Sequence, residues 1–163
     1  MQQVSNFDLQ IAHKYFAAEC FNAAWELIDQ PRRTSEEDEE MIRLTHASLW
    51  HWSEREDCTP RHLSIGYWQA ARVYALLGQA DNARRYGLLC LKYSQGEAPF
   101  YLGYAYEALA RAEWVAGNSA NVKAYLLEAQ KLTAEVGDPE DRELLEKDLA
   151  SIQAVLNKTE QAL

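Results

Sequence analysis

The residues of this chain best suited to chemistry lie in one short segment, from His46 to Trp52. It holds His46, Ser48 and His51 together with two tryptophans. Five residues turn a helix by about 140°, so the two imidazoles do not share a face and are not expected to share a metal ion. Ser48 would act as a nucleophile only beside a histidine that a third group orients. We therefore expect no metal and no catalytic residue here; His51 should form a hydrogen bond between helices and Ser48 should pack closely.

The remaining sequence also lacks the spacings of familiar cofactor and metal sites. There is no Cys-x-x-Cys, His-x-x-x-His or Glu-x-x-His pattern, no glycine-rich phosphate loop and no dinucleotide fingerprint. The three cysteines, Cys20, Cys58 and Cys90, are odd in number and far apart, which favours free thiols in a reducing cytoplasm. We expect no cofactor.

The charge balance bears on the class of partner. The formal net charge is -9, from 25 acidic against 16 basic residues, and the bases are not segregated. This disfavours nucleic acid and anionic membrane surfaces as partners. No apolar run approaches the roughly 20 residues that span a bilayer, and the first residues lack the pattern of a signal peptide. The expected location is the cytoplasm.

The pattern along the chain predicts an all-α fold of seven or eight helices in a single domain, residues 1–163. No segment alternates apolar and polar residues long enough for a strand, and glycine and proline fall mostly where helices should start or stop. Residues 5–30 are interpreted as a degenerate hairpin of two short helices, with one long helix as the alternative. A long helix over 35–55 should begin at the capping box of Thr34 and Glu37.

Four further helices should occupy residues 60–94 and 99–136, and a capping helix should follow over 138–157. Proline marks the start of several of these segments, at Pro60, Pro99 and Pro139. The last helix is expected to bury its leucine and isoleucine stripe: Leu144, Leu145, Leu149, Ile152 and Leu156.

An internal repeat relates residues 60–94 to residues 99–136. Shifting the sequence by 39 residues superimposes identical residues, and an offset of this size is typical of a helical array. The matched pairs are Tyr67 and Tyr106, Ala71 and Ala110, Arg72 and Arg111, Gly78 and Gly117, Asn82 and Asn121, Tyr86 and Tyr125, Leu88 and Leu127, and Lys92 and Lys131.

These residues resemble the signature of tetratricopeptide-like helical-repeat proteins, as found in short bacterial chains. The first copy matches at Ala71, Tyr74, Gly78, Ala83 and Cys90. The second copy keeps Ala110, Gly117 and Ala129, but has Glu113 in place of the aromatic residue and Val122 in place of a small one. The resemblance implies a short solenoid of antiparallel helix hairpins.

In that family the first helix of each hairpin lines a concave face on which peptides bind. Carried over to this chain, the resemblance implies a groove that contains His13, Trp68, Arg72, Tyr104, Glu107, Arg111 and Trp114. Arg72 and Arg111 occupy equivalent positions and would suit a carboxylate or a phosphate. The alternative is an internal ion-pair network, because Arg111 lies four residues after Glu107.

The favoured function is a non-enzymatic module that binds a protein or peptide. The alternative is a small-molecule sensor or an enzyme, with a pocket around the third helix and the first repeat copy. Its residues would be His46, His51, Trp52, Arg72, Tyr74 and Tyr106. Whether the chain forms a homodimer through its N-terminal helices is left open.

Overall fold

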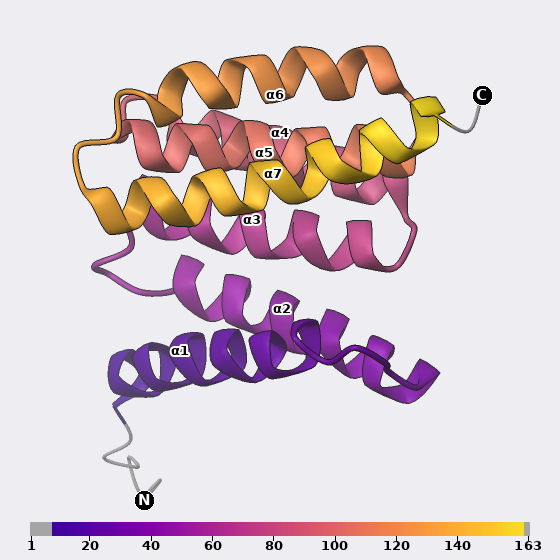
Figure 1. Ribbon diagram of the computed structural model, residues 1–163. Helices are drawn as coiled ribbons and strands as arrows, with labels where there is room; N and C mark the ends of the chain where they lie inside the picture. The colour runs from indigo at the N-terminus through magenta and orange to yellow at the C-terminus, as the bar shows by residue number, and fades with distance from the viewer. Residues whose placement is uncertain (1–7, 162–163) are drawn as a thin grey trace, which may run out of the picture. The chain divides into compact units, whose positions relative to one another are not determined.

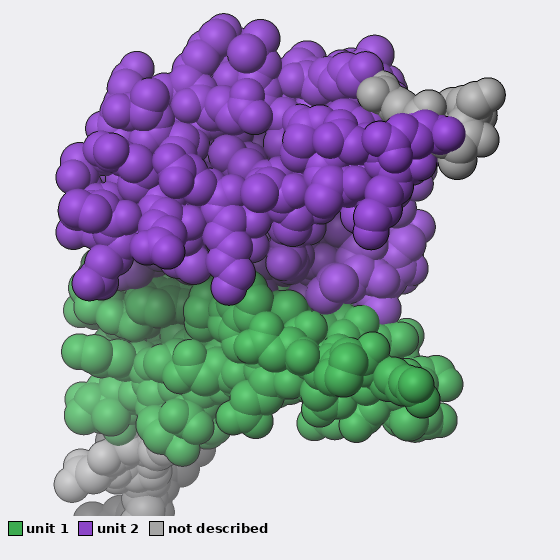
Figure 2. All heavy atoms as spheres, viewed as in Figure 1, with its two compact units in different colours: residues 1–59 green, residues 60–163 purple. Residues whose placement is uncertain are grey.

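The computed structural model describes residues 8–161, and the regular secondary structure within that range is entirely helical (Figure 1). Seven helices are present there, so the prediction of an all-α fold is confirmed. The chain divides into two compact units, residues 1–59 and residues 60–163 (Figure 2). The single domain expected over residues 1–163 stays a prediction.

The first unit contains α1 (Leu9–Ile28) and α2 (Ser35–Ser53), which pack against each other. The hairpin predicted for residues 5–30 is wrong: α1 is one continuous helix, and residues 5–7 lie outside the described part of the chain. The physical reason is that no glycine or proline interrupts the backbone hydrogen bonds between Phe16 and Trp25. Asp8 caps the helix, and its carboxylate accepts hydrogen bonds from the backbone of Gln10 and Ile11.

The start of α2 is the predicted capping box. The Thr34 hydroxyl accepts a hydrogen bond from the Glu37 backbone N–H at 3.2 Å, and the Glu37 carboxylate accepts one from the Thr34 N–H at 2.7 Å. Further along α2, Ser48 is buried and donates to the Ala17 carbonyl at 2.8 Å. The prediction that Ser48 serves close packing is confirmed.

The second unit begins with two helix pairs of matching size. They are α3 (Pro60–Leu76) with α4 (Ala80–Ser94), and α5 (Pro99–Val115) with α6 (Ser119–Thr133). The bounds of the second pair equal those of the first shifted by 39 residues, so the offset in the sequence is also the offset between helices. Gly78 and Gly117 end the first helix of each pair with φ of 71° and 74°, a conformation that glycine adopts without strain.

The helix α5 lies at the centre of this unit. It packs against α3, α4 and α6, and also against the last helix, α7 (Pro139–Gln161), which itself contacts α6. Contact between α5 and α7 is close, because a Cβ atom at Gly103 would lie 2.6 Å from Leu145 Cδ2. The core of the unit gathers around α5, α6 and α7 and includes Leu126, Leu145, Leu149, Ile152 and Leu156.

One residue of the predicted α7 stripe is not buried. Leu144 is 50% exposed, whereas the other four residues of the stripe are at most 4% exposed. Adjacent residues point about 100° apart on a helix. Leu145 is in register with Leu149, Ile152 and Leu156, so Leu144 is turned away from the core that they share.

Candidate functional site

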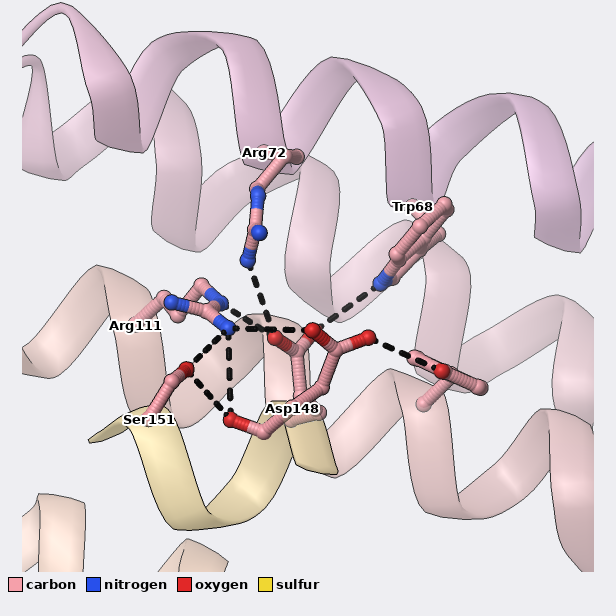
Figure 3. A network of polar contacts seen from close by, with 7 residues as sticks. Trp68, Arg72, Arg111, Asp148 and Ser151 are labelled. Carbon is pink, nitrogen blue, oxygen red and sulfur yellow. Dashed lines mark hydrogen bonds and ion pairs between the residues drawn. The ribbon is translucent and has the colours of Figure 1, made fainter. Parts of the chain in front are cut away.

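A buried carboxylate on α5 organises the polar residues of the second unit (Figure 3). The Glu107 side chain is 0% exposed. One of its oxygens, Oε2, accepts a hydrogen bond from Trp68 Nε1 of α3 at 2.9 Å. The other, Oε1, accepts from Arg72 Nη1 of α3 at 3.2 Å and from Arg111 Nε of α5. Burying a carboxylate costs several kcal/mol unless it is paired and hydrogen-bonded, and here three donors from two helices offset that cost.

Arg111 extends the network to α7. Its Nη2 donates to Ser151 Oγ at 2.9 Å and to the Asp148 carbonyl at 3.3 Å, and it lies 3.7 Å from Asp148 Oδ1. The Tyr104 hydroxyl donates to Asp148 Oδ2 at 2.9 Å. Burial and the nearby Asp148 carboxylate both raise the pKa of Tyr104, so the phenol remains a neutral donor.

Arg72 is the least satisfied member of the network. Its side chain is 20% exposed, and burial is the main cause that lowers its pKa, against the Glu107 carboxylate that raises it. Its Nε is buried and has no hydrogen-bond partner among the described residues. A buried donor without an acceptor costs free energy, so this Nε makes Arg72 the least favourably placed donor of the network.

A groove of about 400 Å³ lies beside the network, between α3, α5 and α7. Two of its described lining residues carry charge, Arg72 and Arg111, and most of the others are apolar. We call this hollow the arginine groove. Its lining comprises Arg72, Ala75, Leu76, Arg111, Trp114, Val115, Ser151, Ile152 and Val155.

A second hollow, of about 260 Å³, lies about one to two helical turns before Arg72 on α3 and about two to three turns before Arg111 on α5. Trp68 and Tyr104 belong both to its wall and to the polar network. We call it the aromatic pocket. Its lining comprises Ser64, Ile65, Trp68, Cys90, Phe100, Tyr101, Tyr104 and Leu144.

The structure brings together the six groove residues predicted in the second unit, but in two roles. Arg72, Arg111 and Trp114 line the arginine groove. The other three support the site from within: Glu107 is fully buried, Tyr104 is 8% exposed, and Trp68 donates to Glu107 without lining the arginine groove. The ion pair expected from the spacing of Glu107 and Arg111 is present, and Arg72 joins it.

Two members of the network, Asp148 and Ser151, were missed in the sequence. Both lie on α7, which was expected only to cap the array. Their contacts with Arg111 span 37 and 40 residues, and no local spacing signals a contact of that range. The sequence offers one signal: Asp148 and Ser151 directly precede Leu149 and Ile152 of the apolar stripe, so they lie at the edge of the buried face of α7.

The seventh predicted groove residue, His13, belongs to the first unit. Its Nδ1 lies 2.9 Å from Nδ1 of His51, at hydrogen-bond distance, and its ring meets the edge of Trp50 at a centroid distance of 5.3 Å. Burial, and secondarily the neighbouring His13, lower the pKa of His51. The expected hydrogen bond between His51 and another helix is thus confirmed. Its partner His13 was predicted to line the groove, whereas His51 was predicted to line the alternative pocket.

The residues of the alternative pocket are divided between the units. Three lie in the first unit (His46, His51 and Trp52) and three in the second (Arg72, Tyr74 and Tyr106). Within the second unit, Tyr74 stacks on Tyr86 of α4 with ring centroids 5.4 Å apart, and Tyr106 lies 6.1 Å from Tyr125 of α6. Arg72 instead reaches Glu107, so these three side chains serve different neighbours.

The thiols are not activated. Burial raises the pKa of Cys90 to about 12, and it also raises the pKa of Cys20 and of Cys58. Within residues 8–161 there is no group of three or more histidine, cysteine or acidic side chains placed to hold a metal ion. None of the helices described is both long enough and apolar enough to cross a membrane.

Comparisons with protein-family models, with curated proteins and with solved structures found no match to this chain.

Proposed function

We propose that the second unit is a non-enzymatic binding module that holds a short peptide segment of a partner protein in the arginine groove. The observation that carries this proposal is the composition of the groove. Apolar side chains such as Leu76 and Val155, which are 44% and 36% exposed, lie beside two arginines that are both paired with the buried Glu107. Apolar surface supplies affinity, and a few fixed polar groups orient a ligand.

The arginines suit the acceptor oxygens of a peptide. A guanidinium carries five N–H donors in a planar fork, and Glu107 accepts one hydrogen bond from Arg72 and one from Arg111. Because Glu107 and Asp148 already hold these side chains, little side-chain entropy is lost when a ligand binds. Peptide carbonyls, or a terminal carboxylate, would accept hydrogen bonds from donors that the network leaves over.

The arrangement of helices supports a tetratricopeptide-like solenoid as the scaffold of this module. The two pairs share their helix lengths and their terminal glycines, and their first helices, α3 and α5, are in contact. In the family that the sequence resembles, such first helices line a peptide-binding face. Here α7 contributes one wall, through Ser151, Ile152 and Val155. The groove is therefore suited to a short segment of a few side chains.

The test begins with a random peptide library selected against the full chain. Selected peptides should lose about 30-fold in affinity when Trp114 is replaced by alanine, because an aromatic side chain within a binding groove is a typical hot spot. Fluorescence anisotropy with labelled peptides gives the dissociation constants. Leu127→Ala is the matched control, since Leu127 is 53% exposed and lies on α6, outside the groove.

Two results would contradict the proposal. One is a set of selected peptides that bind Trp114→Ala and the unmodified chain equally well. The other is a library from which no peptide is enriched, even though circular dichroism shows a folded chain.

A further inference from the structure

We propose that the aromatic pocket is a separate binding site for a small, uncharged aromatic molecule that carries one N–H or O–H donor. The site lies outside the arginine groove, and the proposal does not depend on peptide binding.

The size of the pocket sets the size of its ligand. An apolar cavity of about 150 Å³ holds one benzene ring, so the 260 Å³ of the aromatic pocket suits two fused rings. Three wall residues brace one another edge to face: the Tyr104 ring centroid lies 5.1 Å from that of Trp68 and 5.0 Å from that of Phe100. Such a wall is fixed before a ligand arrives and favours an aromatic guest.

The polar ends of the wall residues point into the network and away from the ligand. Trp68 Nε1 donates to Glu107, and the Tyr104 hydroxyl donates to Asp148. Both rings therefore present carbon to the pocket, and none of the described lining residues carries a charge. A charged ligand would lose its hydration without gaining a partner, so the pocket selects for uncharged molecules.

The floor of the pocket adds one hydrogen-bond acceptor. Ser94 Oγ donates its single proton to the Cys90 carbonyl at 2.8 Å and lies 2.7 Å from Ser64 Oγ. Ser64 must then donate its own proton to Ser94, which leaves two lone pairs; even if the Cys90 thiol, 3.8 Å away, donates to one of them, one acceptor remains. Because Ser64 lines the pocket, a ligand with an N–H or O–H group is preferred over an isostere without one.

The mouth of the pocket is marked by Leu144, which lines it and is 50% exposed. Another lining residue, Tyr101, lies under Arg61, whose guanidinium carbon is 4.9 Å from the ring centroid and whose Nε donates to Glu97 at 2.9 Å. Because Leu144 lines the pocket, a larger side chain at that position would take up part of its volume.

Three probes test the site by NMR titration of the full, isotope-labelled chain: indole, benzofuran and indole-3-acetate. Indole should bind saturably at one site, with shift changes at lining residues such as Phe100 and Tyr101. Benzofuran, which lacks the N–H, should bind about fivefold more weakly, the worth of one neutral hydrogen bond. Indole-3-acetate should bind at least about tenfold more weakly than indole, because no described lining residue carries a positive charge and the nearby Arg61 is already paired with Glu97.

Substitutions then locate the site. Leu144→Trp should weaken indole binding at least about tenfold by narrowing the pocket, while Leu127→Trp, the same change at a similarly exposed position on α6, should leave it unchanged. If Leu144→Trp does not fold, Ser64→Ala decides, since it should abolish the preference for indole over benzofuran. The proposal is overturned if indole does not saturate below its solubility limit, if both tryptophan variants bind it equally, or if its shifts map to Trp114.

Discussion

The two helix pairs of the second unit have the same outline but use different chemistry at two equivalent positions. Their helices have the same lengths, and both first helices end at a glycine of positive φ. Where α3 has Trp68 and Tyr74, however, α5 has Glu107 and Glu113. Aromatic residues in the first pair thus correspond to carboxylates in the second.

The difference follows from where each pair makes its contacts. Tyr74 stacks on Tyr86 with an interplanar angle of 5°, a contact inside the first pair. Glu113, which is 2% exposed, instead accepts a hydrogen bond from Arg84 of α4, and Glu107 accepts hydrogen bonds from both Trp68 and Arg72 of α3. The carboxylates therefore join the second pair to the first.

The helix α5 contacts α3, α4, α6 and α7, so hydrogen bonds from α3 or α4 to the acids of α5 join the two pairs. The same scaffold thus carries one aromatic residue, Tyr74, that stacks within the first pair, and two acids that link the second pair to the first. Glu107 also fixes the arginines of the groove, so this acid links stability to binding.

The largest effect on stability is expected for Glu107→Ala. It should lower the free energy of unfolding by about 3–5 kcal/mol, because Arg72 and Arg111 would be left largely buried without their shared counter-charge. Urea unfolding followed by circular dichroism measures the change. Trp68→Phe is the control: it removes one hydrogen bond to the same carboxylate and should cost about 1 kcal/mol. If Glu107→Ala lowers the free energy of unfolding less than Trp68→Phe does, the Glu107 carboxylate does not hold the two pairs together.

A smaller effect is expected at Glu113, and it depends on pH. The hydrogen bond from Arg84 is the main cause that lowers the pKa of Glu113 below its ordinary value of 4.5. A carboxyl whose pKa is lower in the folded state stabilises the protein above its unfolded pKa, and this contribution is lost as the pH falls through the folded value. Glu113→Gln should cost about 1.5–3 kcal/mol at neutral pH, and the cost should shrink below about pH 4.5.

Urea unfolding at several pH values tests this expectation. Glu128→Gln serves as the control, because Glu128 is an exposed acid on α6 that pairs only at the surface, with Lys131. A cost for Glu113→Gln that stays constant from neutral to acid pH would show that its charge is not what links the pairs.

Much of this architecture could be read from local patterns. The capping box at Thr34 and the turn glycines each act within one or two helical turns, and both are observed. The 39-residue offset repeats regularly along the sequence, and it equals the offset between the two helix pairs. Glu107 and Arg111 were also paired correctly, because residues four apart share a helix face.

Contacts between distant helices could not be read in this way. The sequence around Phe21 resembled the start of a second helix, yet without a glycine or proline α1 continues through it. Asp148 and His13 each meet partners more than 30 residues away, on another helix. Such contacts depend on how helices pack, which hydrophobic periodicity alone does not determine.

The most direct test of the central claim is to locate a bound peptide. A peptide selected from the library and labelled with a nitroxide would broaden the NMR signals of nearby protons in the full chain. The arginine groove as the peptide site predicts broadening of the Trp114 indole N–H and of the Ile152 and Val155 methyl groups. Broadening confined to α1 and α2, with these signals unchanged, would contradict it.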